Sequence, residues 1–318
     1  MKYLVTGGAG FIGYHTAKFL LERKDNVVIV DNFNEYYDPS LKESRINNLK
    51  NYPNLEVIKA DISDFEVMET IFKNHRFDKI CHLAAQAGVR YSIVNPFVYE
   101  RSNILGTLNL LELCRKYNVK HFIFASSSSV YGNNKNIPSS ETDKVDSQIS
   151  FYAATKKSNE ETAYVYHDLY GINCTGLRIF TAYGPFGRPD MAIFLFTKQI
   201  LNGEEVKLFN DGDMKRDFTY IGDIVSGIIS ALDKSYPFEI FNLARGKQVL
   251  LKDFVDEIEL NLKIKAKKAY LPLQPGDVKE TFGDITKAMR MLNYNPKTTI
   301  KEGVKKFVDW YKEYHKLR

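Results

Sequence analysis

The stretch KYLVTGGAGFIG, from Lys2 to Gly13, is the part of the sequence that decides the fold. A short apolar run, typical of a buried strand, passes into a glycine-rich turn that opens a helical pattern. Gly8, Gly10 and Gly13 fit G-x-G-x-x-G, and with Gly7 in place of Gly8 the turn also fits G-x-x-G-x-x-G. Such glycines let the backbone approach a pyrophosphate at the amino end of a helix. A plain strand-to-helix turn would explain them as well, so the neighbouring sequence must decide.

The second strand ends in a carboxylate, as in dinucleotide-binding βαβ units. Asp31 ends the run NVVIVD, 18 residues after Gly13. Its carboxylate can accept hydrogen bonds from both ribose hydroxyls and would repel a 2′-phosphate, so the sequence predicts NAD and not NADP. Asp61 and Ile62 follow the third strand and would suit the adenine edge. From spacing alone, Asp61 could equally be a loop or helix-capping carboxylate.

Strand and helix patterns alternate over the first 180 residues. Continuous apolar strands separated by helices indicate a parallel sheet covered on both faces. Strands are predicted at 2–7, 26–31, 55–61, 78–85, 120–126 and 173–180, and helices at 13–23, 65–73, 103–117 and 152–170. After Phe180 we expect a long loop at 181–190, short strands at 206–209 and 216–221, and helices at 223–233, 251–261, 286–291 and 300–314. The predicted fold class is α/β, a Rossmann-type doubly wound parallel sheet with a smaller mixed α/β substrate-binding lobe.

Composition and charge exclude several classes of protein. The chain has 318 residues, a net charge of +5 and scattered basic residues, whereas a nucleic-acid site would need a basic stripe. Cys81, Cys114 and Cys174 form no CxxC pair, which predicts buried free thiols in a reducing compartment. With no signal-peptide pattern and no long apolar run, we expect a cytoplasmic protein without a membrane partner. The six histidines lack ligand spacing, so no metal site is predicted.

A tyrosine and a lysine form the candidate catalytic pair. Tyr152 and Lys156, in YAATK, are four residues apart and share one face of the predicted helix. An ammonium group beside a phenol favours the phenolate, so Lys156 is expected to lower the pKa of Tyr152 and make it a general base. This spacing is common, and an exposed helical pair would explain it equally well without the glycine turn.

Five motifs together resemble the extended short-chain dehydrogenase/reductase family over the whole chain. They are TGGAGFIG (6–13), HLAA (82–85), SSSSVYG (126–132), YAATK (152–156) and RDFTYIGD (216–223). Within the family the chain resembles nucleotide-sugar enzymes that oxidise and re-reduce C4, in which the catalytic serine lies four residues before the tyrosine of VYG. The resemblance therefore implies Ser127 as the partner of Tyr152 and Lys156. It implies NAD contacts from Gly7, Gly10, Phe11, Ile12, Gly13, Asp31, Asn32, Asp61, Ile62, Leu83, Ala84, Ala85, Asn103, Tyr152 and Lys156.

Two further serines indicate which reaction the resemblance favours. Sugar 4,6-dehydratases carry Asp and Glu just before VYG, whereas this chain has Ser128 and Ser129. A hydroxyl cannot act as the C5 base at neutral pH without its own activator, so dehydration and the decarboxylating route of UDP-xylose synthases are disfavoured and 4-epimerisation remains. The runs DNFNEYYDPSLKESRINNL, LRIFTAYGPFGRPDMA and LPLQPGDVKETFGD resemble UDP-glucuronate 4-epimerases, and Thr181 stands where UDP-glucose 4-epimerases have Asn.

Two other functions stay open. One is a UDP-glucose or UDP-N-acetylhexosamine 4-epimerase of the same fold. The other is a non-catalytic NAD-sensing binding protein, although Ser127, Tyr152 and Lys156 argue against it. For a uronic acid the 4-keto intermediate could also lose CO2, so the carboxylate would have to be held still.

The resemblance also implies where the UDP-sugar binds. The predicted NAD-binding domain is 1–180, with 217–243 returning to it, and 181–216 with 244–318 form the UDP-sugar lobe. Ser126, Ser128, Thr181 and Arg188 are the candidates for the carboxylate, although Thr181 could be a turn hydroxyl and Arg188 a diphosphate or loop residue. Arg216 is expected to pair with the diphosphate, or alternatively with Asp217. Uridine would be held by Phe209, Gln274 and Asp277, Arg290 would reach phosphate, and a homodimer is expected through helices at 97–117 and 151–169.

Overall fold

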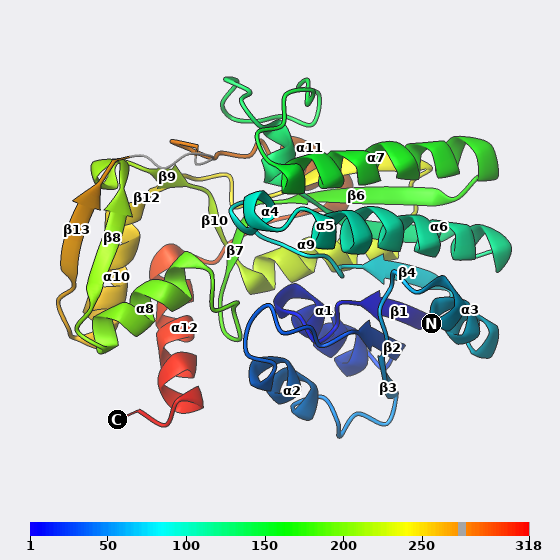
Figure 1. The fold of residues 1–318 in the computed structure, drawn as a ribbon, viewed down its shortest axis with the longest axis horizontal. Helices are drawn as coiled ribbons and strands as arrows, with labels where there is room; N and C mark the ends of the chain where they lie inside the picture. The colour runs from blue at the N-terminus through cyan, green and yellow to red at the C-terminus, as the bar shows by residue number, and fades with distance from the viewer. Residues whose placement is uncertain (273–277, 318) are drawn as a thin grey trace.

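A twisted parallel sheet forms the centre of the molecule (Figure 1). The computed structural model describes residues 1–272 and 278–317. Within these residues, seven parallel strands are arranged in the order β11-β6-β5-β4-β1-β2-β3. They are β1 (Lys2–Thr6), β2 (Asn26–Asp31), β3 (Leu55–Lys59), β4 (Lys79–His82), β5 (His121–Ser127), β6 (Asn173–Ile179) and β11 (Phe238–Leu243). The order reverses between β1 and β4, which is the switch point where doubly wound sheets bind ligands.

Helices cover both faces of this sheet, as predicted. Inward-facing residues alternate along each strand because successive side chains point to opposite faces. Tyr3 and Val5 of β1 pack toward one face, with α1 (Phe11–Glu22), α9 (Ile221–Asp233) and α11 (Thr286–Leu292). Leu4 faces the other way, toward α3 (Phe65–Asn74), α6 (Gly106–Lys116) and α7 (Phe151–Tyr170). The prediction of a doubly wound sheet is confirmed.

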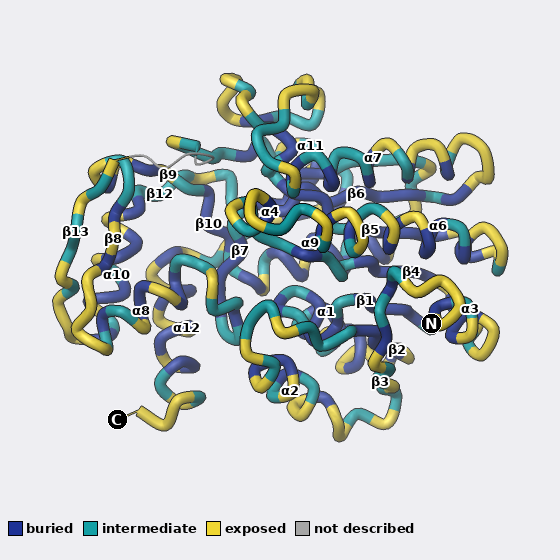
Figure 2. The backbone as a smooth tube through the Cα atoms, viewed as in Figure 1, coloured by how far each residue is buried: buried dark blue, intermediate teal, exposed yellow. Residues whose placement is uncertain are grey.

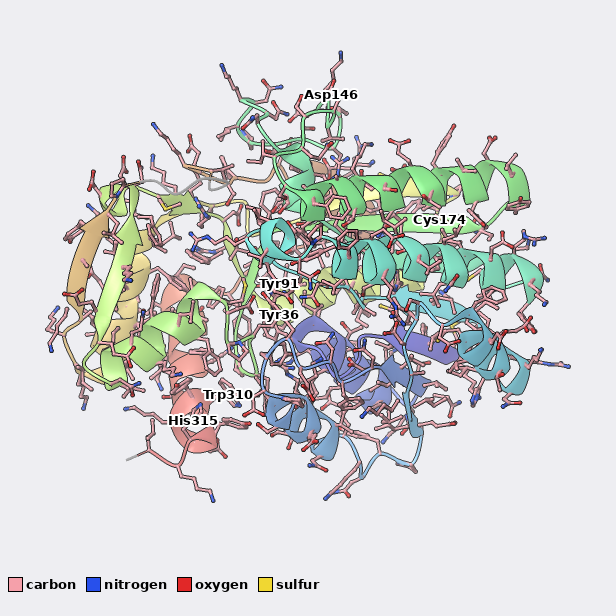
Figure 3. The ribbon with its side chains drawn as sticks, in the orientation of Figure 1. Tyr36, Tyr91, Asp146, Cys174, Trp310 and His315 are labelled. Carbon is pink, nitrogen blue, oxygen red and sulfur yellow. The ribbon has the colours of Figure 1, made fainter. Side chains whose placement is uncertain are left out.

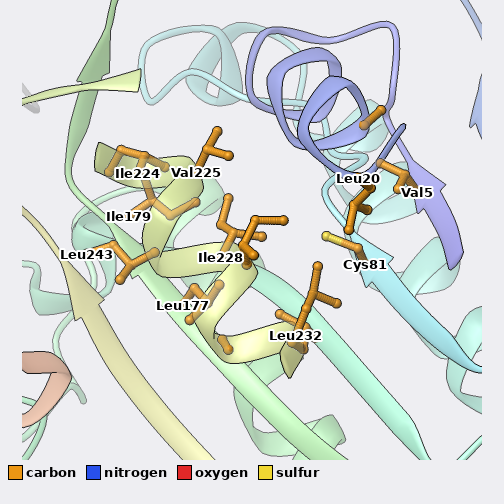
Figure 4. Packing of buried hydrophobic residues seen from close by; sticks show 14 of the residues in the cluster. Val5, Leu20, Cys81, Leu177, Ile179, Ile224, Val225, Ile228, Leu232 and Leu243 are labelled. Carbon is orange, nitrogen blue, oxygen red and sulfur yellow. The ribbon is translucent and has the colours of Figure 1, made fainter. Parts of the chain in front are cut away.

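The packing around α9 connects the late part of the chain to the early strands. Figure 4 shows Ile224 and Ile228 of α9 in one cluster with Leu177 of β6 and Leu20 of α1. These side chains are fully buried. Burying each such side chain contributes about 1.5–3 kcal/mol, so this cluster fixes α9 and β11 against the sheet. After residue 216 the chain therefore returns to the sheet, where α9 packs in this cluster and β11 pairs with β6.

A smaller lobe is attached beside the carboxyl ends of the strands. Its core is aromatic, with Phe218 and Phe254 stacked at 4.0 Å between ring centroids. The lobe contains α8 (Ala192–Leu201), β8 (Glu205–Phe209), the short helix Asn210–Gly212, β9 (Lys215–Arg216), β12 (Val249–Leu250), α10 (Leu251–Leu262), β13 (Lys267–Leu271) and α12 (Ile300–Tyr314). Strands β7 (Thr181–Tyr183) and β10 (Phe218–Tyr220) pair in parallel between the sheet and the lobe. Figure 1 places α8, α10 and α12 side by side there.

Several elements differ from the sequence prediction. The predicted loop at 181–190 begins with a short strand, β7, and the predicted strand at 216–221 is split into β9 and β10. The sequence patterns did not predict α2 (Ser40–Asn47), α8, β11, β12 or β13. They also missed α4 (Tyr91–Val94), α5 (Phe97–Tyr99) and the first half of the π-helix Glu100–Leu105, since the predicted helix began at residue 103. Two-residue pairings such as β9 with β12 depend on tertiary contacts, which local periodicity does not report.

Burial follows this architecture. In Figure 2 the inner strands β1, β2, β4, β5 and β6 of the central sheet are largely buried, whereas the edge strand β3 is exposed or half-buried. Cys81, Cys114 and Cys174 are buried free thiols, as predicted. None of the helices in the described ranges is long and apolar enough to cross a membrane.

Candidate functional site

One cavity lies at the carboxyl ends of β1, β2, β4 and β5, and its volume is about 410 Å³. We call its two ends the glycine end, around Gly7 to Gly13, and the serine end, around Ser127, Tyr152 and Arg188. The sequence-predicted residues that line it are Gly7, Gly10, Phe11, Ile12, Gly13, Asp31, Asn32, Ile62, Leu83, Ala84, Ala85, Ser126, Ser127, Ser128, Tyr152, Lys156, Thr181 and Arg188. Segments more than 170 residues apart in the sequence thus meet in one cavity.

The glycine end is shaped by the absence of side chains. Gly7 has φ +69°, and a Cβ there would lie 2.7 Å from the backbone nitrogen of Ala84. A Cβ on Gly13 would lie 2.1 Å from the carbonyl oxygen of Gly7. Both distances are far below van der Waals contact, so the turn packs against β4 and begins α1 only with glycine at these positions. The resulting cradle presents backbone N–H groups at a helix amino end, which fits a pyrophosphate.

Asp31 is held by backbone groups at the edge of this cradle. Its two oxygens accept hydrogen bonds from the N–H groups of Ala9, at 3.1 Å, and Phe33, at 2.9 Å. Lys42 of α2 places its Nζ 3.9 Å from Asp31 Oδ1 and also lines the cavity. Burial lowers the pKa of Lys42. The sequence analysis missed Lys42 because it did not predict α2.

Two predicted cofactor residues act behind the cavity wall. Asp61 accepts hydrogen bonds from Ser63 and from the Asn32 amide, at 3.0 Å, so its carboxylate serves as the loop clamp that spacing left open. Asn103 accepts from the N–H of Gln86 at 2.8 Å and donates to the Gln86 carbonyl and to Thr155. These contacts fix the segment after β4 against α7.

Helix α7 presents the candidate catalytic pair. It begins after Ser150, whose hydroxyl accepts from the N–H of Ala153, and Tyr152 follows in the first turn with its side chain lining the cavity. Burial raises the pKa of Tyr152, and a hydrogen bond with Ser127 and the charge of Arg188 partly oppose that shift. Lys156 donates instead to the Ala125 carbonyl at 2.7 Å. The net shift of the Tyr152 pKa is upward, because burial outweighs Ser127 and Arg188. The lowering of that pKa by Lys156 stays a prediction.

The four serines divide between two environments. The Ser127 hydroxyl lies toward Tyr152 and accepts from the N–H of Ser129 at 3.1 Å, and Ser128 and Ser129 also line the cavity. The Ser126 hydroxyl points to the opposite side of β5 and donates to Glu160 Oε1 at 2.6 Å. Since side chains alternate along a strand, Ser126 and Ser127 of β5 point to opposite faces. The Ser126 hydroxyl is engaged by Glu160, and its contact with a substrate carboxylate stays a prediction.

The partner of Ser126 belongs to a buried ion pair. Glu160, one turn after Lys156 on α7, accepts from Arg178 Nε and Nη2, both at 2.9 Å. Arg178 also lies over the Tyr131 ring, 4.9 Å from its centroid. A bidentate pair of this kind is directional, and it joins α7 to β6 directly beneath the serines.

Arg188 enters the serine end from the segment between β7 and α8. Its guanidinium donates to both oxygens of Asp190, at 2.9 Å and 2.6 Å. Burial alone would lower the pKa of Arg188, but the charge of Asp190, its hydrogen bonds to the guanidinium, and Tyr152 and Tyr36 together raise it. Tyr36 donates to the same carboxylate at 3.2 Å. Tyr36 and Asp190 were not predicted; their sequence signal, a tyrosine pair and a GRPD run, had no spacing that linked them.

Of the residues expected to hold the nucleotide, Gln274 and Asp277 lie outside the described residues. Phe209, Arg216 and Arg290 do not line this cavity. Arg216 donates to the carbonyls of Lys215, Lys279 and Val278. Arg290 is exposed on α11.

Two lobe residues make contacts that bear on those predictions. The Phe209 ring lies 5.1 Å from the guanidinium carbon of Arg90. The Asp217 carboxylate accepts hydrogen bonds from the backbone N–H groups of Arg245, Gly246 and Gly283. These contacts are with backbone groups and not with the Arg216 side chain. Burial raises the pKa of Asp217 to about 6.

Comparison with known proteins places this geometry among nucleotide-sugar enzymes. A family model described as GDP-mannose 4,6 dehydratase matches residues 4–307. A UDP-glucuronate 4-epimerase of Thermodesulfobacterium geofontis is 47% identical over 312 residues, which cover 98% of this chain and 96% of that protein. The structure of UDP-glucuronic acid 4-epimerase from Bacillus cereus in complex with UDP-glucuronic acid and NAD matches with a TM-score of 0.91 and 36% identity, covering 99% of this chain and 100% of that one.

A structure of UDP-glucose 4-epimerase from Thermotoga maritima with UDP-glucose matches equally well in shape, with a TM-score of 0.91, 34% identity and coverage of 99% and 100%. Shape alone thus does not distinguish the sugar. The family match, however, spans nearly the whole chain and includes the glycine turn, the serines and the Tyr152–Lys156 pair. The chain belongs to the GDP-mannose 4,6-dehydratase-like family of extended short-chain dehydrogenases/reductases.

Proposed function

We propose that this protein is an NAD-dependent 4-epimerase that interconverts UDP-glucuronate and UDP-galacturonate. The observation that carries the proposal is the meeting of Ser127, Tyr152 and Lys156 at one end of a cavity whose other end is a glycine cradle. A relative at 47% identity bears the name UDP-glucuronate 4-epimerase, which supports this sugar over its neutral counterpart.

The residues of the glycine end fit a dinucleotide. The cradle at Gly7 and Gly13 leaves room where a Cβ would stand, and the Asp31 carboxylate faces the same cavity for the ribose hydroxyls. Ile62 and Asn32 line the cavity and would face the adenine, and Leu83 to Ala85 line it beside Gly7. When bound there, NAD would accept the hydride from sugar C4 and return it.

The side chains of the serine end would move the proton. Tyr152 would take the proton of the 4-hydroxyl, and Ser127, already hydrogen-bonded to it, would hold the same oxygen. Because burial raises the pKa of Tyr152, the phenolate needs compensation, which the positive charges of Arg188 and Lys156 can supply. The Ala125 carbonyl orients the Lys156 ammonium group.

The same end contains groups suited to a carboxylate. Ser128 and Thr181 line the cavity with hydroxyl groups, and Arg188 adds a guanidinium. Holding the carboxylate by hydrogen bonds keeps the C5–C6 bond out of alignment with the 4-ketone, which would suppress loss of CO2. No carboxylate side chain stands at 128 or 129 to abstract a C5 proton, and this argues against dehydration.

The remaining alternative is a UDP-glucose or UDP-N-acetylhexosamine 4-epimerase. The structural similarity to the Thermotoga maritima UDP-glucose 4-epimerase supports this alternative. A neutral sugar would offer Arg188 no carboxylate. The uronate therefore makes better use of the charges at the serine end.

The decisive experiment is the product formed from UDP-glucuronate. We expect UDP-galacturonate, with no net NADH and no CO2, and a clear preference over UDP-glucose. Tyr152→Phe should lower kcat by about 10²–10⁴, the usual contribution of a general base, while bound nicotinamide and the circular dichroism spectrum are kept. A preference for UDP-glucose would favour the alternative, and full activity of Tyr152→Phe would contradict the enzyme assignment.

We also propose a cytoplasmic homodimer with a domain division at 1–180 plus 217–243 and 181–216 plus 244–318. The three buried free thiols suit a reducing compartment. Exposed apolar side chains gather on α4 to α7, including Val94 (78% exposed), Phe97 (79%) and Leu169 (62%), and a second copy of the chain would cover them. Light scattering distinguishes such a dimer from a monomer of 36.6 kDa.

A further inference from the structure

A chain of polar contacts crosses from the sheet to the lobe beside the serine end. Tyr36 lies between β2 and α2, whereas Arg188 and Asp190 lie between β7 and α8. The Tyr36 hydroxyl donates to Asp190 Oδ2 at 3.2 Å, and the same carboxylate accepts from Nε and Nη2 of Arg188. We call these three residues the latch. It is the contact by which the segment after β2 reaches the charged side chain that faces Tyr152.

The ring of Tyr36 is held independently of its hydroxyl group. It packs against Tyr91 at 5.0 Å between centroids, and Figure 3 shows these two labelled side chains close together at the centre of the molecule. Gly88, with φ +106°, lies beneath the hydroxyl, and a Cβ there would be 2.9 Å from the Tyr36 oxygen. The packing therefore directs the Tyr36 hydroxyl toward Asp190 before any ligand binds.

The geometry of the Arg188–Asp190 pair separates it from an ordinary surface ion pair. The two side chains are 23% and 31% exposed, and single exposed pairs are worth at most about 1 kcal/mol. The Arg188–Asp190 pair is bidentate, and Tyr36 donates a further hydrogen bond to the same carboxylate. Bidentate geometry and a third partner make an ion pair directional. Asp190 engages Nε and one N–H of Nη2, so the two N–H groups of Nη1 and the second N–H of Nη2 remain for a ligand.

We propose that Tyr36 and Asp190 are positioning residues that hold Arg188 at the serine end and thereby make it a specificity-determining group for an acidic sugar. The proposal deepens the proposed function and rests on it only for the activity measurement. Asp190 fixes the orientation of the guanidinium, and Tyr36 fixes Asp190 to the sheet side of the cavity. Tyr36 itself also lines the cavity, so the proposal predicts that the loss of its hydroxyl acts on substrate chiefly through Arg188, and a cycle with Arg188 tests this.

The first test needs no substrate. Tyr36→Phe keeps the ring and its packing on Tyr91 but removes the donor to Asp190. Hydrogen–deuterium exchange of residues 184–191 in the purified protein should become at least about threefold faster, because segments with fewer tertiary contacts open more often. Tyr52→Phe is the matched control, since Tyr52 donates to the exposed carboxylate of Glu22 at 3.3 Å away from the cavity. Equal exchange in wild type and Tyr36→Phe would overturn the latch.

The second test is a double-mutant cycle on UDP-glucuronate. Tyr36→Phe should lower kcat/KM by about tenfold in the wild-type background, as for the loss of one hydrogen bond, and by less than about twofold in an Arg188→Met background. Asp190→Asn should behave in the same way, and kcat/KM for UDP-glucose should fall less. Equal losses in both backgrounds would overturn the positioning role. If the wild-type protein does not turn over UDP-glucuronate, the proposed function is wrong. The hydrogen–deuterium exchange experiment still tests the latch in that case.

Discussion

The two ends of the cavity are built from different parts of the polypeptide. The glycine end is made of backbone, and its shape depends on atoms that are absent: a Cβ on Gly13 would lie 2.1 Å from the Gly7 carbonyl oxygen. The serine end is made of side chains from both sides of the cavity, including Ser127 on β5 and Arg188 after β7. The glycine end tolerates no added atom, whereas the serine end can be changed one hydrogen bond or one charge at a time.

This difference decides where recognition and reaction are located. A backbone cradle offers N–H groups to any pyrophosphate but cannot read the rest of the ligand. Hydroxyl groups and charges at fixed positions can distinguish one sugar from another, because an unpaired buried group costs about 1–3 kcal/mol. We therefore expect substitutions at the glycine end to remove cofactor binding altogether and those at the serine end to alter rate and specificity.

The largest effect is expected for Gly13→Ala. The added Cβ must displace the Gly7 carbonyl, so the turn and the start of α1 shift and bound nicotinamide should fall below about a tenth of the wild-type content, with a loss of about 1–3 kcal/mol in the free energy of unfolding. Absorbance of the released nicotinamide and thermal unfolding measure both. Gly171→Ala is the control: Gly171 also needs a special conformation, φ +63°, but nothing lies within 4 Å of its Cβ position, so its nicotinamide content should stay normal. Full cofactor content in Gly13→Ala would refute the cradle.

A smaller effect, divided between rate and stability, is expected at two neighbouring serines. Ser127→Ala removes the hydrogen bond to Tyr152 and should lower kcat by about 10–100-fold with little change in the melting temperature. Ser126→Ala instead removes a buried hydrogen bond to Glu160 and should cost about 1–2 kcal/mol in the free energy of unfolding, with kcat within about threefold of wild type. If Ser126→Ala were the slower enzyme, the division of the serines between the two faces of β5 would be incorrect.

The same division explains how far the sequence could predict the structure. Gly7, Asp31 and the first six strands of the sheet follow local patterns, so these strands, the two covered faces and the glycine end were predictable, whereas the seventh strand, β11, was not. Alternation along β5 already required Ser126 and Ser127 to face opposite ways, although the sequence did not say which one faced Tyr152. Tyr36 and Asp190 meet across about 150 residues through a helix and a loop with no periodic signal, and such contacts require the folded chain.

The smallest and most graded effect should come from the charge of Lys156. Burial lowers the pKa of Lys156 to about 8, so its ammonium group is present below pH 8 and is lost above it, whereas in the unfolded chain it would persist to about pH 10. His82, whose pKa is lowered by burial to about 3, stays neutral, and Arg188 stays charged, so Lys156 is the neighbour of Tyr152 that titrates in this range. If its charge stabilises the phenolate, kcat should fall about fivefold between pH 8 and pH 9, as the charged fraction of Lys156 does, with bound nicotinamide measured at each pH to exclude cofactor loss. A flat profile would mean that Arg188 alone supplies the positive charge that stabilises the Tyr152 phenolate. The latch that holds Arg188 would then matter more for the rate than Lys156.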